Sequence, residues 1–386
     1  MNFELSEEQR LLVKTVASFV KRETPVARLR TMRADPIGWS RDVWRKMGEF
    51  GWLGVAFPET VGGAGGSFVD AALILEQLGT TLVLEPFIPA LIAAYPLLRL
   101  GTDEQHRAFL APMIAGQTSL ALAYAEAEGR FSESDVATRA ARSARGYRID
   151  GRKRWVLNGH AADTIVVSAR TAGSAHDQEG ISLFIVDRNA PGLVRTPVKT
   201  MDGHHAAMLT FQGVDVPEDR RLGAEGSAHA ALSLAMDVGS AAACAEGVGI
   251  IKTVLAMTTD YLRTREQFGV KIGSFQALQH RAVDMFIEAE LCASMSILAS
   301  IKLGEPDELE RQSAISAAKA QLAMGGRYVT QQAIQLHGGI GVTDEHDVGL
   351  YFKRMHILNT LFGDEDHHVA RFARSPSFEA DLDAVS

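Results

Sequence analysis

The segment NTLFGDEDHH (359–368) places three acidic residues and two histidines after a glycine near the end of the chain. Asp364 and His368 have the i, i+4 spacing that can hold a cation on a helix, but no third ligand is apparent. Consecutive acids on a helix point in different directions, so they do not converge on one substrate atom. Acids in a first helical turn complement the helix dipole. The segment therefore predicts a helix start, without a metal and without a catalytic base.

Glu246 is a second carboxylate that could do chemistry. Its neighbours at helical contact positions are Ala242, Ala243, Gly249 and Ile250, and no lysine or arginine is among them. A buried carboxylate without a partner is costly unless it has a task. Loss of water raises the pKa of such a group, which suits a general base, and small neighbours would let a substrate approach. Glu246 is therefore the predicted base, and a glutamate that faces solvent or pairs across subunits is the alternative.

Helical regions at both ends of the chain must position these groups. Residues 1–118 show apolar residues at helical spacing, interrupted by a Pro/Gly loop. Residues 226–376 contain three long alanine-rich runs and a shorter last one, which predict a four-helix bundle. The final residues, 377–386, are polar and read as a frayed tail.

The middle region, 119–225, has a different character. Its short runs are β-branched or alternating and are bounded by glycine, proline and aspartate. Asp150-Gly151 between two extended runs predicts a hairpin, and several such strands predict a sandwich or barrel. The expected fold is therefore multidomain α+β, with a β-domain between two helical domains.

Composition excludes several classes of function. A net charge of −8 repels phosphate backbones, so nucleic acid is not an expected partner. Cys244 and Cys292 lie in apolar helical surroundings and read as reduced core thiols, which indicates a reducing compartment. The N-terminus has no apolar signal core, and the most apolar stretch, 82–100, is broken by Glu85 and three prolines. We expect a soluble cytoplasmic protein that does not cross a membrane.

Four motifs in this order resemble those of the acyl-CoA dehydrogenase family: LSEEQRLLV (5–13), GRKRWVLNG (151–159), REQFGVKIGSFQALQH (265–280) and QLHGGIG (335–341). The resemblance covers nearly the whole chain. It implies FAD held between the β-domain and the bundle, with a neighbouring subunit closing over it. The implied reaction is α,β-dehydrogenation of an acyl-CoA thioester, with hydride transfer to flavin N5 and reoxidation by an electron-transfer flavoprotein.

The resemblance also implies which residues contact FAD. Arg265 can hold a pyrophosphate oxygen with its fork of donors, and glutamine amides suit the edges of a nucleotide. Glycines after a helix allow close backbone approach to a phosphate. The ordinary alternatives are a surface arginine, solvated glutamines, core aromatic rings and a helix C-cap. Leu157 stands where the family often has threonine. The implied residues are Ser134, Trp155, Leu157, Arg265, Gln267, Phe268, Gln276, Gln335, Gly338 and Gly339.

The usual catalytic glutamate of this family has no counterpart at either of its common positions. Alignment on Gly363 puts Phe362 at one position, and Gly239 stands at the other. Glu246 then matches the base of relatives that act on bulky acyl-CoAs. The phrase GGIGVTDEHDVGLYFKR (338–354) resembles the same branch, several of whose members pair two different subunits. We expect a homomeric or mixed tetramer, a dimer of dimers, because the alanine-rich helices are too apolar to be solvated on every side.

Two other functions fit the same resemblance. The chain could be a non-catalytic subunit that lends structure and half of a FAD site to a partner carrying the base. It could also be a flavin oxidase or monooxygenase on the same fold. The sequence does not specify the acyl group.

Overall fold

The structure is a computed structural model that describes residues 4–374, so the predicted tail 377–386 lies outside the described residues. The described residues form two compact units. The bundle unit contains 4–30, 68–83 and 240–374, and the sheet unit contains 31–67 and 84–239. Helical segments precede and follow a sheet along the chain, which confirms the predicted fold class. The boundaries at 118 and 225 stay predictions.

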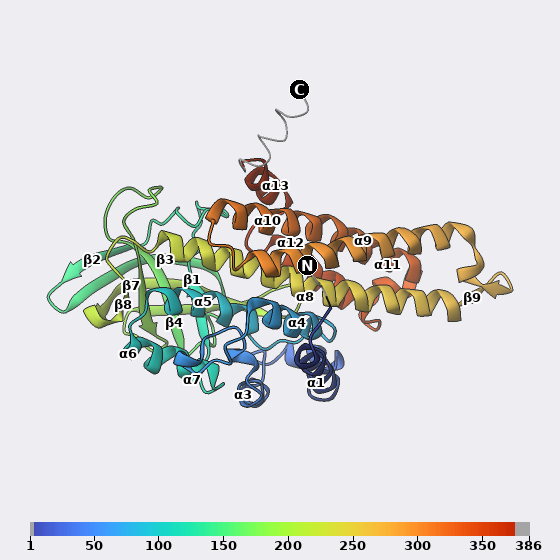
Figure 1. Cartoon of the computed structure of the whole chain (residues 1–386), viewed down its shortest axis with the longest axis horizontal. Coiled ribbons are helices and arrows are strands. Elements are labelled where there is room, and N and C mark those ends of the chain that lie inside the picture. The colour runs from blue at the N-terminus through green and yellow to red at the C-terminus, as the bar shows by residue number, and fades with distance from the viewer. Residues whose placement is uncertain (1–3, 375–386) are drawn as a thin grey trace, which may run out of the picture. The chain divides into compact units, whose positions relative to one another are not determined.

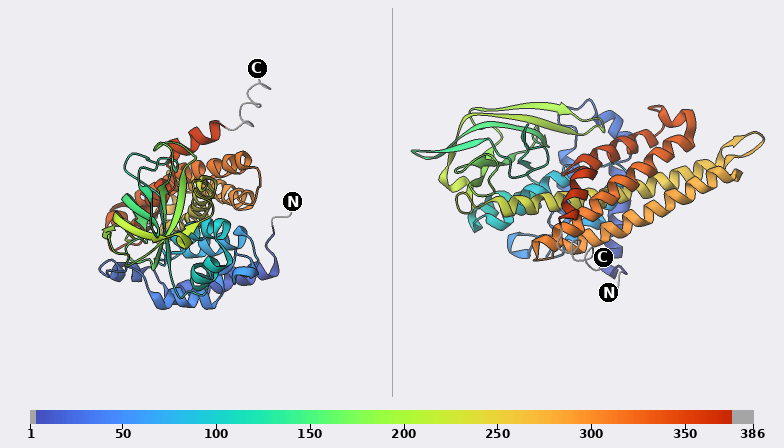
Figure 2. Two further views of the ribbon diagram at one scale, coloured as in Figure 1. Left: turned by 90° about the vertical axis from the view of Figure 1, so that its left-hand side faces the viewer. Right: turned by 90° about the horizontal axis from the view of Figure 1, so that it is seen from above.

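The bundle unit is built from long helices that lie side by side (Figures 1 and 2). The helix α8 enters it at Ser240. A π-helical segment, Leu322–Gly326, joins α10 to α11. The helices are α1 (Glu7–Glu23), α2 (Ala27–Met32), α4 (Phe68–Gly79), α8 (His229–Thr264), α9 (Gln276–Lys302), α10 (Glu308–Gln321), α11 (Arg327–His337), α12 (Val348–Thr360) and α13 (Glu365–Ala373).

The helix α4 crosses α8 at a contact made by glycines. A Cβ on Gly249 would lie 1.9 Å from the carbonyl oxygen of Glu76, and a Cβ on Gly79 would lie 2.2 Å from the carbonyl oxygen of Glu246. Any larger side chain at either position would separate the two backbones. The crossing therefore brings α4 directly against the turn of α8 that carries Glu246.

The sheet unit contains one eight-stranded sheet with the strand order β6-β7-β3-β2-β4-β5-β8, and β1 pairs with β4 in parallel. The strands are β1 (Leu120–Ala123), β2 (Arg139–Ser143), β3 (Gly146–Leu157), β4 (Thr164–Arg170), β5 (Ile181–Asp187), β6 (Leu193–Lys199), β7 (His205–Pro217) and β8 (Arg221–Leu222). The helices of this unit are α3 (Arg41–Glu49), α5 (Phe87–Leu100), α6 (Asp103–Gln105) and α7 (Ala111–Ile114).

The hairpin predicted at Asp150-Gly151 is wrong, because β3 runs through both residues. The turn comes earlier, between Ser143 and Gly146, where β2 pairs with β3. Asp150 instead accepts a hydrogen bond from the backbone N–H of Gly213 (2.7 Å), and the ladder shifts register between Ile149 and Gly151. Gly151 has φ +152°, so the Asp-Gly pair serves a bulge instead of a turn.

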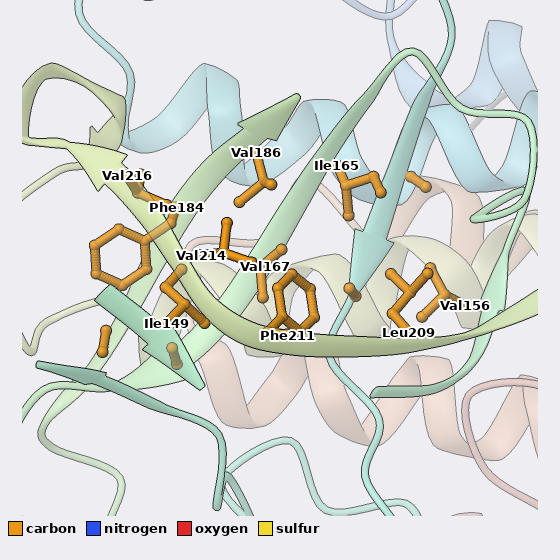
Figure 3. Close-up of a cluster of buried hydrophobic side chains, with 14 of the residues drawn as sticks. Ile149, Val156, Ile165, Val167, Phe184, Val186, Leu209, Phe211, Val214 and Val216 are labelled. Carbon is orange, nitrogen blue, oxygen red and sulfur yellow. The ribbon is translucent and has the colours of Figure 1, made fainter. Parts of the chain in front are cut away.

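Apolar side chains from six strands form the core of the sheet unit (Figure 3). They alternate along β3 and β7 with exposed residues, as a half-buried strand requires. Strands β4 and β5 are buried on both faces and read as continuous apolar runs. The labelled members are Ile149, Val156, Ile165, Val167, Phe184, Val186, Leu209, Phe211, Val214 and Val216.

Among the described residues, α8 is the one helix long and apolar enough to span a membrane. Its most apolar window is 94% buried within the protein. Cys244 lies on this helix, and both it and Cys292 are free and buried, as predicted. Burial raises the pKa of each thiol to about 12. These properties are those of a core helix.

Candidate functional site

One end of the bundle unit gathers most of the predicted cofactor residues. Helices α9 and α11 run antiparallel, because Arg281 donates to Gln332 (2.8 Å) and Tyr328 donates to Asp284 (3.5 Å). The start of α9, at Gln276, therefore lies beside the end of α11. Tyr261, one turn before the end of α8, stacks on His337 at 4.6 Å between ring centroids, which brings the end of α8 to the same place.

A short hairpin connects α8 to α9 at this end. It pairs β9 (Glu266–Gln267) with β10 (Val270–Lys271), and Figure 2 shows it extending past the helix ends. Phe268 and Gly269 form the turn with positive φ values, and the Phe268 ring is 90% exposed. This exposure excludes the core role considered for Phe268. Arg265, Gln267 and Gln276 are also exposed, so they can reach a ligand or a second chain. The Gln267 amide donates to the carbonyl oxygen of Glu266 (2.8 Å).

The turn after α11 has room for a bound group. Gly338 caps the helix with φ +63°, which explains why glycine is needed there. Gly339 has no such φ, and a Cβ added to it would meet nothing within 4 Å. Neither backbone conformation nor packing within the chain accounts for glycine at 339. An open glycine turn beside exposed Gln335, near a fork of arginine donors, fits a phosphate-bearing ligand such as FAD.

His337, which the sequence analysis missed, supports this turn. Its Nδ1 donates to the carbonyl oxygen of Ala333 (2.8 Å), and its ring lies between Tyr261 and His346. Burial lowers the pKa of His337, so the ring is neutral near pH 7. Its position just before Gly338 was the signal that could have identified it.

In the sheet unit, a bulge on β3 directs Trp155 outward. Lys153 pairs with Leu209 and Val156 pairs with Ala207, so β3 has one more residue than β7 over this interval. The extra residue reverses the alternation, which places Val156 in the core and leaves Trp155 54% exposed with φ +51°. Core packing is therefore excluded for Trp155. Leu157 follows in the ladder, half-buried opposite Ala206.

The loop that carries Ser134 lies in the same unit and is tied to buried charges. Glu126 accepts hydrogen bonds from the backbone N–H groups of Ala137 (2.8 Å) and Thr138 (3.1 Å). It also forms a buried ion pair with Lys153 at 2.6 Å. Burial lowers the pKa of Lys153 to about 8, against the opposing attraction of Glu126. The Ser134 hydroxyl lies 3.0 Å from that of Ser132, and the residue is half-buried.

The premise that Glu246 is unpaired is wrong. Arg354 on α12 donates from Nε to Glu246 Oε1 (2.6 Å) and from Nη2 to Oε2 (2.9 Å). The Glu246 side chain is 7% exposed, and the Arg354 side chain is 8% exposed. The sequence reasoning searched only the helix of Glu246, whereas its partner lies 108 residues later. The two hydrogen bonds fix the direction of both carboxylate oxygens.

The small residues around Glu246 do not leave open space. Ala242, Ala243 and Ile250 are fully buried, and Gly249 faces the backbone of α4. The inference that these neighbours would let a substrate approach is therefore also wrong on their side of the helix. Their physical role is the close crossing of α4 and α8.

The segment 359–368 is a helix start, as predicted. The helix α12 ends at Thr360, and Asp364 caps α13 by accepting from the backbone N–H of His367 (3.0 Å). The intervening Phe362 and Gly363 have positive φ, and the Phe362 ring is buried. Buried Lys319 donates to the carbonyl oxygens of Asn359 (3.1 Å) and Gly363 (3.0 Å), so it holds this turn. Burial lowers the pKa of Lys319 to about 8.

Comparison with known proteins addresses the family directly. The acyl-CoA dehydrogenase N-terminal, middle and C-terminal domain models match residues 6–117, 121–214 and 229–376. A curated relative, "Probable acyl-CoA dehydrogenase YngJ" of Bacillus subtilis, is 31% identical and covers 90% of this chain and 92% of its own.

Solved structures agree over the whole chain. One, described as the electron transferring flavoprotein of Acidaminococcus fermentans, has a TM-score of 0.90 at 29% identity and covers 97% of this chain and 99% of its own. Another, the ChsE4-ChsE5 complex of Mycobacterium tuberculosis, has a TM-score of 0.87 at 26% identity and covers 98% and 99%. The chain therefore belongs to the acyl-CoA dehydrogenase family, and it is an oxidoreductase whose cofactor is FAD.

Proposed function

We propose that this protein catalyses the α,β-dehydrogenation of an acyl-CoA thioester and passes the electrons to an electron-transfer flavoprotein. The observation that carries the cofactor site is the convergence of Arg265, Gln276 and Gln335 with the open Gly338–Gly339 turn at one end of the bundle unit. Gln267 and Phe268 on the hairpin, and Ser134, Trp155 and Leu157 in the sheet unit, complete the proposed FAD contacts. FAD, when bound, supplies the two-electron acceptor.

Glu246 is the proposed general base. The Arg354 guanidinium lies against the carboxylate and holds its orientation. The same pair opposes proton transfer, because protonation would remove the negative charge that the Arg354 guanidinium binds. Each carboxylate oxygen accepts one hydrogen bond from Arg354 and keeps a second lone pair, so Glu246 can take the α-proton while the pair stays in place. Arg354 thus sets both the orientation and the reactivity of Glu246.

The Glu246–Arg354 pair also favours a second function. A buried, fully bonded carboxylate at a helix crossing can be purely structural, because removing either partner strands the other charge. The chain would then be the supporting subunit of a mixed assembly, and its partner would carry the base. The similarity to one chain of the ChsE4-ChsE5 complex supports this candidate.

Assembly with a second subunit is part of both proposals. One face of α9 exposes Val283, Phe286, Ile287 and Leu291, which follow the i, i+3, i+4, i+8 pattern of one helical face. An apolar helical face of this kind is usual at subunit interfaces and rare on monomers. We expect a dimer of dimers, homomeric or mixed, in the cytoplasm. The proposed substrate is a bulky acyl-CoA, because the segment 338–354 resembles the branch of the family that acts on such substrates.

Purification and a substrate screen test this proposal. The purified protein should carry FAD, and a panel of acyl-CoAs under anaerobic conditions should include one that bleaches the flavin. Slow reoxidation by oxygen and fast reoxidation by an electron-transfer flavoprotein are expected, and the reverse order would indicate an oxidase or monooxygenase. A protein that neither holds nor takes up FAD, alone or co-expressed with a related subunit, contradicts the proposal.

A further inference from the structure

The segment 134–138 of the sheet unit is held by side chains, because it belongs to no strand or helix. Arg170, the last residue of β4, lies behind it. The Arg170 guanidinium donates from Nη2 to the carbonyl oxygen of Ser134 (2.8 Å) and from Nε to that of Val136 (3.0 Å). The backbone N–H of Arg170 donates to the carbonyl oxygen of Thr138 (2.7 Å). One residue therefore fixes three points along this segment.

The rest of the Arg170 guanidinium binds a second loop. Nη1 donates to the carbonyl oxygen of Glu179 (2.8 Å), and Nη2 donates to those of Ala175 (3.1 Å) and Asp177 (2.9 Å). Arg170 is 3% exposed, and all its side-chain hydrogen bonds to described residues go to backbone carbonyls. Carbonyl dipoles solvate the cation, but no carboxylate bonded to it cancels its charge.

The far end of the segment is fixed by an ion pair of zero net charge. Glu126 accepts from the N–H groups of Ala137 and Thr138 while it binds Lys153. Burial alone would raise the pKa of Glu126, but the Lys153 ammonium and the hydrogen bonds lower it below its usual value. Lys153 also donates to the hydroxyl of Ser168 (2.8 Å). Asp177, Glu126 and Asp135 lie near enough to attract the Arg170 cation, but its side-chain hydrogen bonds to described residues all go to carbonyl oxygens.

We propose that Arg170 is a positioning residue for the diphosphate of FAD. It fixes the Ser134 loop before the cofactor arrives and places a buried cation behind it. The inference rests on the proposal that Ser134 contacts FAD. A loop that is ordered in advance loses less entropy on binding, and a buried cation attracts a diphosphate more strongly than an exposed one.

Two substitutions separate geometry from charge. Arg170→Gln removes both the fork and the charge. Arg170→Lys keeps the charge but offers one compact ammonium, which cannot reach five carbonyl groups in two loops. Arg195→Gln is the matched control, because Arg195 is a half-buried arginine of the same unit that donates to the carbonyl oxygens of His160 (3.1 Å) and Ala162 (3.5 Å).

The measurement is the dissociation constant of FAD from each apoprotein, with the 31P spectrum of bound FAD as the second readout. Hydrogen bonds to a charged group are each worth enough for about a tenfold effect. We expect Arg170→Gln to raise the constant by roughly tenfold to a hundredfold, Arg170→Lys by about fivefold or more, and the control by less than about threefold. The phosphate resonances should shift in both Arg170 variants.

A merely structural role would lower the melting temperature of the apoprotein and leave the FAD dissociation constant and the 31P resonances unchanged. That result overturns the inference. If Arg170→Gln does not fold, Arg170→Lys decides by the same criteria. Ser134→Ala separates the proposed FAD contact at Ser134 from the proposed role of Arg170. If Ser134→Ala binds FAD more weakly while the Arg170 variants bind it normally, only the role of Arg170 is overturned. Normal binding in all three variants overturns the proposed contact at Ser134 as well.

Discussion

The Glu246–Arg354 pair should contribute strongly to stability, and its removal can be measured as a double-mutant cycle. Both side chains are more than nine-tenths buried, and two hydrogen bonds of 2.6 and 2.9 Å join them. Removing one partner of such a pair leaves a buried charge without compensation, which costs about 3–5 kcal/mol. Arg354→Met and Glu246→Gln should therefore each lower the free energy of unfolding by about this amount.

The double variant should recover much of the loss, because neither charge then remains. We expect Glu246→Gln with Arg354→Met to lie within about 2 kcal/mol of the parent, which makes the coupling energy at least ~4 kcal/mol. Urea denaturation followed by circular dichroism measures each corner of the cycle. A coupling energy below about 0.5 kcal/mol would refute the inference that these charges stabilise each other in the fold.

A second ion pair on the same helix provides the control. Lys252 on α8 binds Glu76 on α4 at 2.7 Å, but the side chains are 50% and 24% exposed. Exposed pairs contribute about 0–1 kcal/mol, because water screens them and ordering long side chains costs entropy. Lys252→Met should therefore change the free energy of unfolding by less than about 1 kcal/mol.

Three further predictions follow from the packing and the turns. Gly339→Ala should leave the stability of the apoprotein unchanged and weaken FAD binding. Gly249→Ala should lower the melting temperature, because the added Cβ would lie 1.9 Å from the backbone of Glu76. Thermal melts and FAD titration of each variant check these expectations. The pKa of Lys319 is lowered to about 8, so on raising the pH the folded chain releases this proton before the unfolded chain does. Lys319 therefore makes the free energy of unfolding rise as pH increases from about 8 toward 10.5. Lys319→Met should flatten this rise, which urea titrations at several pH values measure. Asp364→Ala should cost about 0.5–2 kcal/mol through loss of the α13 cap, and Asp364→Asn should change the rate of flavin reduction little.

The helices and the overall order of the chain were predictable because their signals are local. Ser6 begins α1 with a capping box, in which its hydroxyl accepts from the N–H of Gln9, and a periodic apolar face follows. Asp364 caps α13 in the same way. Such signals depend on residues within one or two turns, so a single sequence contains them.

The β-region shows where local signals fail. Asp150-Gly151 has the composition of a hairpin turn but lies inside β3, because β3 pairs with β2 at Asp150 and with β7 at Ile149 and Gly151. The outward direction of Trp155 depends on a bulge relative to β7. Register between strands is a tertiary property, and the residues of one strand do not contain it.

The candidate base shows the same limit for charge. The sequence placed Glu246 correctly on an apolar helical face, and it is buried. It could not show that α12 brings Arg354 to that face, since an ion pair between distant segments has no signature in the spacing of residues. A lone carboxylate in an apolar run, together with a lone arginine in another, was the available hint.

Anaerobic stopped-flow reduction of the FAD-loaded protein tests most directly whether this chain carries its own base. The acyl-CoA that bleaches the parent fastest is mixed with the parent, with Glu246→Gln and with Glu246→Gln/Arg354→Met. We expect both variants to keep FAD and to lose at least about two orders of magnitude in the rate of bleaching, which is the scale of a lost general base, even where the double variant regains stability. Bleaching by the double variant at the parent rate would show that Glu246 is not the base and assign the pair a structural role.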